Sequence, residues 1–200
     1  INGITLLENT INLFKNLNIS NLKINSFYLK DQIQNFISKK NFDINIEVIE
    51  DGKEILDTGG GILNLIKNSN EDNFLVLNPD TLWNSRYINT IKKMENFYFI
   101  NKVNNLLMVV NKNKSFDKRF KGDFELKENN LNHNKQSNNY IFTGCQIINK
   151  KLLLEFTDQP FSISKVWNNL IKKNKLYGYE SLDKFVHITD LEIYKKLLKN

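Results

Sequence analysis

The sequence contains no alanine, one cysteine, two prolines and only two arginines among its 28 basic residues. Its apolar residues are instead isoleucine, leucine, phenylalanine, valine and tyrosine, and asparagine occurs 34 times. This bias is typical of a codon usage rich in A and T, so it carries no functional information. It also weakens the usual interpretation of asparagine as a turn residue. Position along the chain is therefore a better guide to structure than residue propensity.

The absence of long apolar runs and of paired cysteines excludes two classes of protein. The longest apolar stretches, such as Leu106–Val110, are far shorter than the roughly 20 residues that cross a bilayer. A lone cysteine, Cys145, excludes an internal disulfide and is typical of a reducing compartment. It lies in the apolar run Tyr140–Ile148, which favours a buried structural thiol over a nucleophile. We expect a cytoplasmic protein with no membrane partner.

The net charge of +6 comes from the second half of the chain. Residues 1–100 carry 10 basic and 12 acidic side chains, whereas residues 101–200 carry 18 and 10. A basic half attracts anions, either nucleic acid or a small phosphorylated molecule. Because the lysines are scattered and no basic run is flanked by regularly spaced aromatics, we expect no nucleic-acid partner.

Hydrophobic periodicity predicts one α/β domain over residues 1–200. Between residues 21 and 78, predicted strands alternate with helical patterns, as in successive right-handed βαβ units. The run Phe74–Leu77 is apolar at every position, which is typical of a central strand covered on both faces. The second half predicts strands at 106–110, 140–148 and 176–179, a hairpin at 124–134, and helices at 150–156, at 162–173 and after Thr189.

The segment Asp57–Gly61 combines a polar pair with a glycine triplet between a predicted strand and a predicted helix. Glycines allow backbone amides to approach a ligand closely, and a helix N-terminus favours anions. The alternative interpretation is a flexible turn.

Asp80 follows the apolar strand directly, in the sequence Asn78-Pro79-Asp80. A carboxylate at the carboxyl end of a central strand is where open α/β sheets hold metal-bound phosphates. Asp80 could equally cap the next helix. His187 and Asp190 lie at a predicted strand end before the last helix, and taken alone they are typical of a solvated histidine and an N-cap.

The order of these segments resembles the sugar-1-phosphate nucleotidyltransferases. Within them the sequence is most similar to the branch of N-acetylmuramate-1-phosphate uridylyltransferase and the mannose-1-phosphate guanylyltransferase-like proteins. The resemblance covers nearly the whole chain, and it implies a three-layer Rossmann-like nucleotidyltransferase fold with a mixed, mostly parallel central sheet and helices on both faces. It is carried by the segments 57–62, 74–80, 122–124, 142–144, 161–162 and 186–189.

The resemblance also implies a role for several residues. It implies that Asp57, Thr58, Gly59 and Gly60 contact the nucleotide base, and that Asp80 is the catalytic residue and holds Mg²⁺. The further roles that it implies are a sugar-phosphate contact for Gly122, Thr143 and Gly144, and a second metal-side contact for His187.

The implied reaction is of EC 2.7.7 type and joins a nucleoside triphosphate to a sugar 1-phosphate. UTP with N-acetylmuramate 1-phosphate, in cell-wall recycling, is the expected pair, and GTP with mannose 1-phosphate is the alternative. A degenerate module that binds nucleotide or sugar without catalysis, and a basic nucleic-acid binder, are the other hypotheses. We expect a monomer or a weak dimer.

The sequence departs from the family in two places. The family begins with a glycine-rich segment, Gly-x-Gly-x-Arg followed by a Pro-Lys-Pro motif, which is not found in residues 1–200, so we expect a domain whose front is incomplete. The second metal motif commonly carries aspartate, where this chain has His187. A histidine nitrogen is a softer ligand than magnesium prefers.

Overall fold

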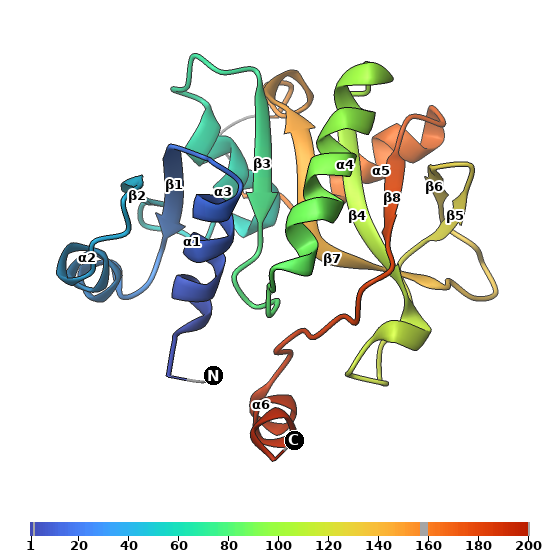
Figure 1. Cartoon of the computed structure of the whole chain (residues 1–200). Coiled ribbons are helices and arrows are strands. Elements are labelled where there is room, and N and C mark those ends of the chain that lie inside the picture. Colours follow the sequence, from blue (N-terminus) through green and yellow to red (C-terminus); the bar gives the residue numbers. More distant parts are fainter. Residues whose placement is uncertain (2, 157–159, 200) are drawn as a thin grey trace.

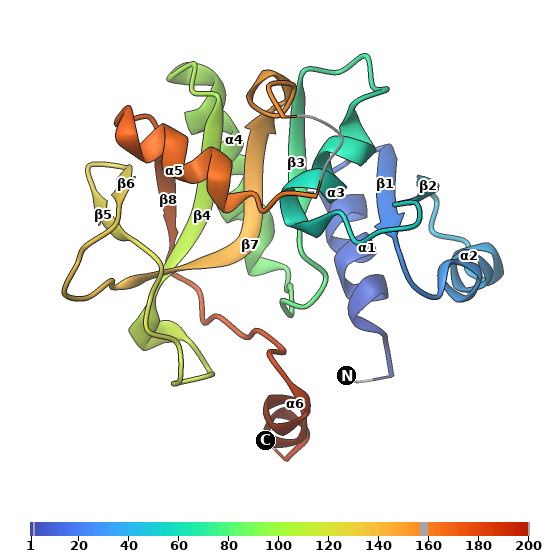
Figure 2. The ribbon, with the colours of Figure 1, turned by 180° about the vertical axis from the view of Figure 1, so that it is seen from behind.

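A mixed sheet of six strands lies between two helical layers, with a second, two-stranded sheet beside it (Figures 1 and 2). The computed structural model describes residues 1, 3–156 and 160–199. None of the helices in this part of the chain is long and apolar enough to cross a membrane. In chain order the elements are α1 (Leu6–Asn16), β1 (Asn21–Ser26), α2 (Lys30–Lys39), β2 (Asn45–Glu50), α3 (Asp57–Ile66), β3 (Asn73–Leu77), α4 (Arg86–Ile100), β4 (Asn105–Asn111), the 3-10 helix η1 (Lys112–Lys114), β5 (Glu125–Lys127), β6 (Asn130–Asn132), β7 (Tyr140–Asn149), the 3-10 helix η2 (Lys150–Leu152), α5 (Ser164–Lys172), β8 (Tyr177–Ser181) and α6 (Leu191–Leu198).

The strand order of the large sheet is β3-β7-β4-β8-β6-β5. Strand β7 runs antiparallel to both β3 and β4, β4 pairs in parallel with β8, and β6 runs antiparallel to β8 and β5. Strands β1 and β2 pair in parallel as the separate sheet. The predicted α/β class, with a mixed sheet flanked by helices, is therefore confirmed. The pairing itself is less parallel than expected, because β7 and β6 run against the common direction and interrupt it.

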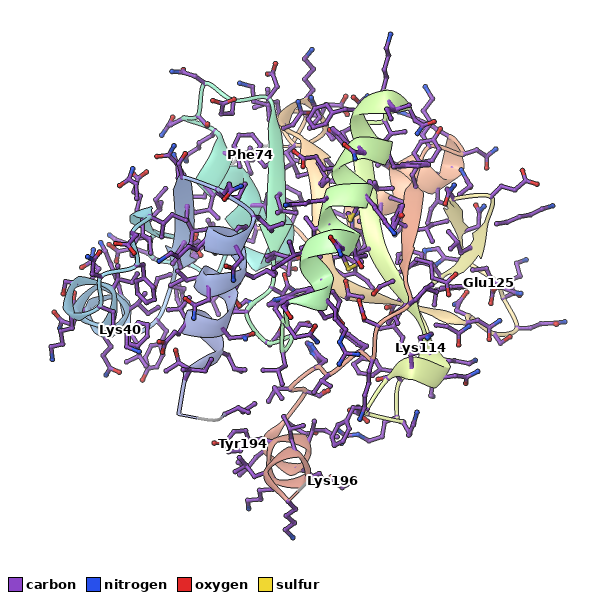
Figure 3. The ribbon with its side chains drawn as sticks, in the orientation of Figure 1. Lys40, Phe74, Lys114, Glu125, Tyr194 and Lys196 are labelled. Atoms are coloured by element: carbon purple, nitrogen blue, oxygen red, sulfur yellow. The ribbon has the colours of Figure 1, made fainter. Side chains whose placement is uncertain are left out.

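The core is divided between the two faces of the sheet by the alternation of β4. Leu106 and Met108 pack with α1 and α4, whereas Leu107 and Val109 pack with α3 and α5. All four side chains are completely buried. Successive residues of a strand point to opposite faces, so one apolar strand contributes to both helical layers. Charged side chains lie at the periphery, as Figure 3 shows for Lys40, directly after α2, and Lys196 on α6.

Three elements differ from the sequence prediction. Strand β3 lies at the edge of the six-stranded sheet and is only partly buried, where the apolar run predicts a central strand covered on both faces. Helix α4 has no counterpart in the sequence prediction, although its buried residues recur at helical spacing, at Tyr87, Ile91, Met94 and Tyr98. The predicted helix at 150–156 is reduced to η2, which begins where the Asn149 side chain accepts a hydrogen bond from the backbone N–H of Lys151. The β-hairpin and the last helix lie where the sequence predicts them.

Helix α1 is attached to the loop after β3 by a single asparagine side chain. Asn9 donates from Nδ2 to the backbone oxygen of Trp83 at 2.7 Å and accepts from the backbone N–H of Trp83 at 2.8 Å. Both polar groups of the Trp83 backbone are thus satisfied by one amide. Trp83 is nearly fully buried, so these groups have little access to water.

We expect Asn9→Ala to destabilise the protein by about 1–3 kcal/mol, because it leaves two buried backbone groups of Trp83 unpaired. Asn16→Ala is the matched control, since Asn16 lies on the same helix and is exposed. Urea unfolding followed by circular dichroism measures both changes. Equal midpoints for the two variants would show that the two hydrogen bonds between Asn9 and Trp83 do not contribute to stability.

Candidate active site

The loop after β3 is held by two hydrogen bonds to β7 and by one within the loop. The backbone N–H of Asn78 donates to the oxygen of Gly144 at 2.8 Å, and the buried Thr81 hydroxyl donates to the oxygen of Thr143 at 2.7 Å. The indole N–H of Trp83 donates back to the oxygen of Asn78. Asp80 is therefore presented at the carboxyl end of β3 by a constrained loop.

Asp80 lies beside His187, from the segment that precedes α6. The backbone N–H of Ile188 donates to the backbone oxygen of Asp80 at 2.8 Å, and Thr81 and His187 form an antiparallel bridge. Nδ1 of His187 lies 3.6 Å from Oδ1 of Asp80 and 3.4 Å from the Thr81 hydroxyl. The structure thus brings together the two residues for which the sequence predicts a shared metal role.

One oxygen of Asp80 is suited to a cation. Oδ1 is buried and has no hydrogen-bond partner, although 47% of the side chain is exposed. Within the described ranges, no group of three or more histidine, cysteine or acidic side chains could enclose a metal. Magnesium is usually held by one or two carboxylates together with water and substrate phosphates. The residues present fit that kind of site and do not form a cage made of protein alone.

A cavity of about 450 Å³ opens next to His187. Its walls are mainly aromatic: the rings of Phe142 and Trp167 meet edge to face at 4.8 Å, and His133 stacks on Phe124 at 5.3 Å. Pockets of this size with apolar walls and a few polar groups are typical of small-molecule sites. The lining residues are Phe120, Gly122, Asp123, Phe124, His133, Ile141, Phe142, Ser164, Trp167, Phe185 and His187.

Asp123 is the carboxylate of this cavity and has no role in the sequence prediction. It accepts a hydrogen bond from the backbone N–H of Phe142 at 2.9 Å, and burial raises the pKa of its carboxyl group. His133 bridges the Asp123 backbone oxygen and the Asn168 side chain. In the sequence, only the neighbouring motif residue Gly122 indicates a functional role for Asp123. The other side chains around it, His133, Phe142 and Trp167, come from separate elements, so their meeting in the cavity is not visible in the sequence.

Of the three residues predicted to contact the sugar phosphate, only Gly122 lines the cavity. Gly122 has φ +90°, and a Cβ there would lie 2.3 Å from the backbone oxygen of Asn138. The Thr143 hydroxyl is buried and donates to the oxygen of Met108 at 3.0 Å. Gly144 has φ +88° and packs against Asn78. Thr143 and Gly144 therefore shape the loop that carries Asp80.

The segment Asp57–Gly60 forms the first turn of α3, where the sequence predicts a loop before the helix. The backbone N–H groups of Gly59 and Gly60 both donate to the oxygen of Phe161, and the Thr58 hydroxyl accepts from Ile163. A Cβ on Gly59 would lie 2.3 Å from the Phe161 ring. These glycines therefore allow close packing of the Phe161 segment, while Asp57 and Thr58 remain exposed. A nucleotide contact at this segment stays a prediction.

Comparisons with solved structures assign the fold. HddC from Yersinia pseudotuberculosis superposes with a TM-score of 0.74 at 21% identity, over 97% of this chain and 84% of that one. The UDP-glucose pyrophosphorylase from Acinetobacter baumannii gives 0.74 at 16%, over 96% and 80%. The inositol-1-phosphate CTP transferase from T. maritima gives 0.69 at 15%, over 100% and 84%.

The chain has the nucleotidyltransferase fold. No family model matches the sequence, and no curated protein matches it significantly. The likeness is therefore one of architecture at low sequence identity.

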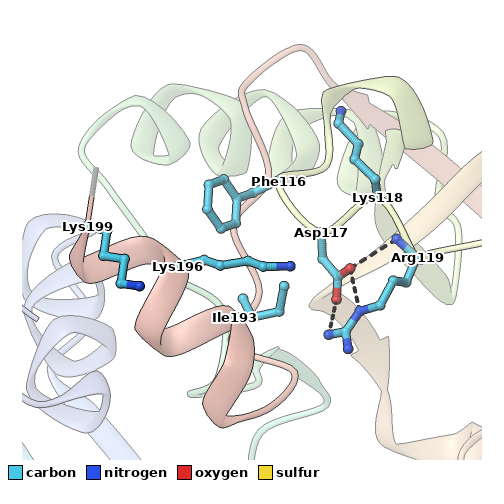
Figure 4. A pocket seen from close by; sticks show the side chains of 7 residues that line it. All are labelled: Phe116, Asp117, Lys118, Arg119, Ile193, Lys196 and Lys199. Atoms are coloured by element: carbon cyan, nitrogen blue, oxygen red, sulfur yellow. Dashed lines mark hydrogen bonds and ion pairs between the residues drawn. The ribbon is translucent and has the colours of Figure 1, made fainter.

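An ion-pair network holds the segment that carries His187. Arg119 donates from Nε and Nη2 to the two carboxylate oxygens of Asp117 at 2.9 and 2.8 Å, and it also pairs with Asp190 at 2.8 Å. The Thr189 hydroxyl donates to Asp117, which is 3% exposed. Figure 4 shows the Asp117–Arg119 pair beside α6, at the edge of a second cavity of about 460 Å³.

Hydrogen bonds from Arg119 hold the pKa of Asp117 well below its ordinary value of 3.8, against the effect of burial. A lowered folded-state pKa contributes stability that is complete above this ordinary value and is lost as the pH falls below it. We therefore expect Asp117→Asn to be less stable at neutral pH and to lose less stability than the wild type on acidification.

Urea midpoints measured from pH 7 down to pH 2.5 test this expectation. The control is Asp31→Asn, which removes an exposed carboxylate in the first turn of α2. Parallel pH profiles for the wild type and Asp117→Asn would contradict the role assigned to the Asp117–Arg119 pair.

Proposed function

We propose that this protein is a nucleotidyltransferase that forms a nucleoside-diphosphate sugar and pyrophosphate. The observation that carries the proposal is the contact between Asp80 and His187 at the end of β3, beside an aromatic cavity with a single carboxylate, Asp123. The fold supports it, since structures of this architecture include a UDP-glucose pyrophosphorylase and an inositol-1-phosphate CTP transferase. The proposed substrates are UTP and N-acetylmuramate 1-phosphate, with GTP and mannose 1-phosphate as the alternative pair.

The reaction needs no covalent intermediate on the protein. A phosphate oxygen of the sugar 1-phosphate attacks the α-phosphorus in line, the new P–O bond forms, and the bond to the β-phosphate oxygen breaks. Pyrophosphate leaves with the electron pair of that bond. The protein contributes by holding two anionic substrates in line and by stabilising charge on the transferred group.

The described residues divide this work between two places. Asp80, with His187 beside it, would hold magnesium. The bound metal would neutralise the charge of the substrate phosphates. The cavity would hold the sugar, with Phe142 and Trp167 packing on its apolar face. Asp123 would accept a hydrogen bond from a sugar hydroxyl, since one of its oxygens already accepts from the Phe142 backbone and fixes its orientation.

We expect Asp80→Asn to lower turnover by at least about 100-fold, because an amide oxygen has no charge with which to bind the cation. Its fold is expected to be unchanged, since the backbone of Asp80 makes the contact to Ile188. Pyrophosphate release in the presence of magnesium measures the effect, with Asp31→Asn as the matched carboxylate control. Near-normal turnover in Asp80→Asn would place the metal elsewhere.

We expect Asp123→Asn to raise KM for the sugar 1-phosphate by about 10-fold while leaving KM for the nucleotide unchanged, because a charged acceptor for a sugar hydroxyl is lost. Steady-state kinetics with each substrate varied in turn separate the two constants. A change confined to the nucleotide KM would mean that the cavity binds the nucleotide instead.

Binding without catalysis is the second candidate function. It is favoured by a contrast between two parts of the site. The aromatic cavity can hold a sugar, whereas the backbone donors of Gly59 and Gly60 are taken by Phe161 and are not free to bind the phosphate or base of a nucleotide. A panel of UTP, GTP, CTP and dTTP with several sugar 1-phosphates distinguishes the two functions. Pyrophosphate release with any pair supports the enzyme, whereas calorimetric binding without release supports the binding module.

A further inference from the structure

A pair of buried polar side chains lies in the apolar layer between the sheet and α5. Gln146 of β7 is 2% exposed, and Asn105 of β4 is completely buried. The cross-strand neighbours of Gln146 are Val76 and Leu107, which both pack in this apolar layer. Figure 2 shows α5 on this face of the sheet, in front of β4. The surroundings of the polar pair are therefore apolar.

One oxygen of Gln146 accepts two hydrogen bonds. Nδ2 of Asn105 and the indole N–H of Trp167, on α5, each donate to Oε1 of Gln146 at 3.3 Å. Oδ1 of Asn105 is buried and has no hydrogen-bond partner. Polar groups among apolar side chains lower stability unless they are paired, so an apolar pair would fill the same space at lower cost. What the polar pair adds is an acceptor for the indole of Trp167.

The ring of Trp167 forms a wall of the aromatic cavity and is oriented by two kinds of contact. The rings of Phe142 and Phe124 meet it edge to face, at 4.8 and 6.0 Å. These contacts constrain the plane of the indole, but the torsion that turns an aromatic ring is broad and roughly two-fold. A half-turn about that torsion nearly preserves the plane and exchanges the two edges of the ring. The hydrogen bond to Gln146 selects one edge, because the indole has a single polar atom.

We propose that Gln146 is a positioning residue for the sugar site and acts through Trp167. By accepting the N–H inside the core, Gln146 leaves only apolar indole surface to the cavity and withholds the donor of the ring from the ligand. Polar recognition of the sugar then falls to Asp123, whose orientation is fixed by the backbone N–H of Phe142. This inference rests on the proposed function, since it takes the sugar to be the ligand of the cavity.

The test is Gln146→Met, which removes the acceptor and retains the length of the side chain. Gln34→Met, at an exposed position on α2, is the matched control. The two tryptophans give separate indole N–H signals in NMR, and Trp83, whose indole donates to Asn78 at 3.0 Å, is the internal reference. We expect Gln146→Met to speed solvent exchange of the Trp167 indole proton at least about 10-fold and to leave that of Trp83 unchanged.

Steady-state kinetics show the effect on the reaction. We expect Gln146→Met to raise KM for the sugar 1-phosphate about 5- to 10-fold, because a wall of the sugar site loses its orientation. Turnover and KM for the nucleotide are expected to stay within about twofold of the wild type.

A double variant, Asn105→Leu with Gln146→Met, separates positioning from folding, because it removes both members of the buried pair. Replacing both partners by apolar groups of similar size is nearly neutral or stabilising. We therefore expect its urea midpoint to be no lower than that of the wild type, with the same rise in KM for the sugar 1-phosphate.

Four outcomes would overturn the inference. An unchanged Trp167 signal in Gln146→Met would show that Gln146 does not hold the indole. A changed signal with an unchanged KM for the sugar 1-phosphate would show that the site does not depend on the orientation of the indole. A lower urea midpoint in the double variant would assign the polar pair to core stability. If the wild type released no pyrophosphate and bound no sugar 1-phosphate in calorimetry, the proposed function would fail first, and the inference with it.

Discussion

The buried hydroxyl of Thr81 joins three segments that lie far apart in the sequence. It donates its one proton to the backbone oxygen of Thr143 on β7 and lies 3.4 Å from Nδ1 of His187, and Thr81 itself lies in the loop after β3. Because a hydroxyl has a single proton to donate, it faces His187 as an acceptor. The geometry therefore favours the histidine tautomer with hydrogen on Nδ1, facing the Thr81 hydroxyl. The position of Asp80 relative to the cavity depends on this arrangement.

Apolar and ionic contacts position the two sides of the site by different means. On the β3 side, a fully buried strand, β4, and its neighbour β7 hold the loop, and Gly144 permits the close approach of Asn78. On the other side, the segment with His187 has no long strand of its own. It is held by the Asp117–Arg119–Asp190 ion pairs, which resist separation because Asp117 is buried among its partners.

The sequence predicted those parts of the structure that residues close together along the chain determine. The apolar run Phe74–Leu77 and the position of Asp80 directly after it were sufficient to place a carboxylate at a strand end. Helix α4 was missed although Tyr87 and Met94 lie on one face, because its other aromatic residues obscure the helical period. The cavity could not be predicted, since Phe142 and Trp167 meet only through the pairing of β7 with β4 and the packing of α5 on that sheet. The role of Thr143 was also not predictable, because its place in the motif does not reveal that its hydroxyl donates to the backbone oxygen of Met108 on β4.

The only sulfhydryl of the chain lies on β7, next to the edge strand β3. Cys145 pairs with Leu77 across the β3–β7 ladder, is completely buried, and has a pKa that burial raises far above the usual thiol value. The thiolate is the form that reacts with alkylating agents, so modification requires the side-chain cluster between the sheet and α4 to open and expose the sulfur to water. Because there is no second cysteine to compete, the rate of alkylation measures how often the packing over β7, the strand that holds the Asp80 loop, opens.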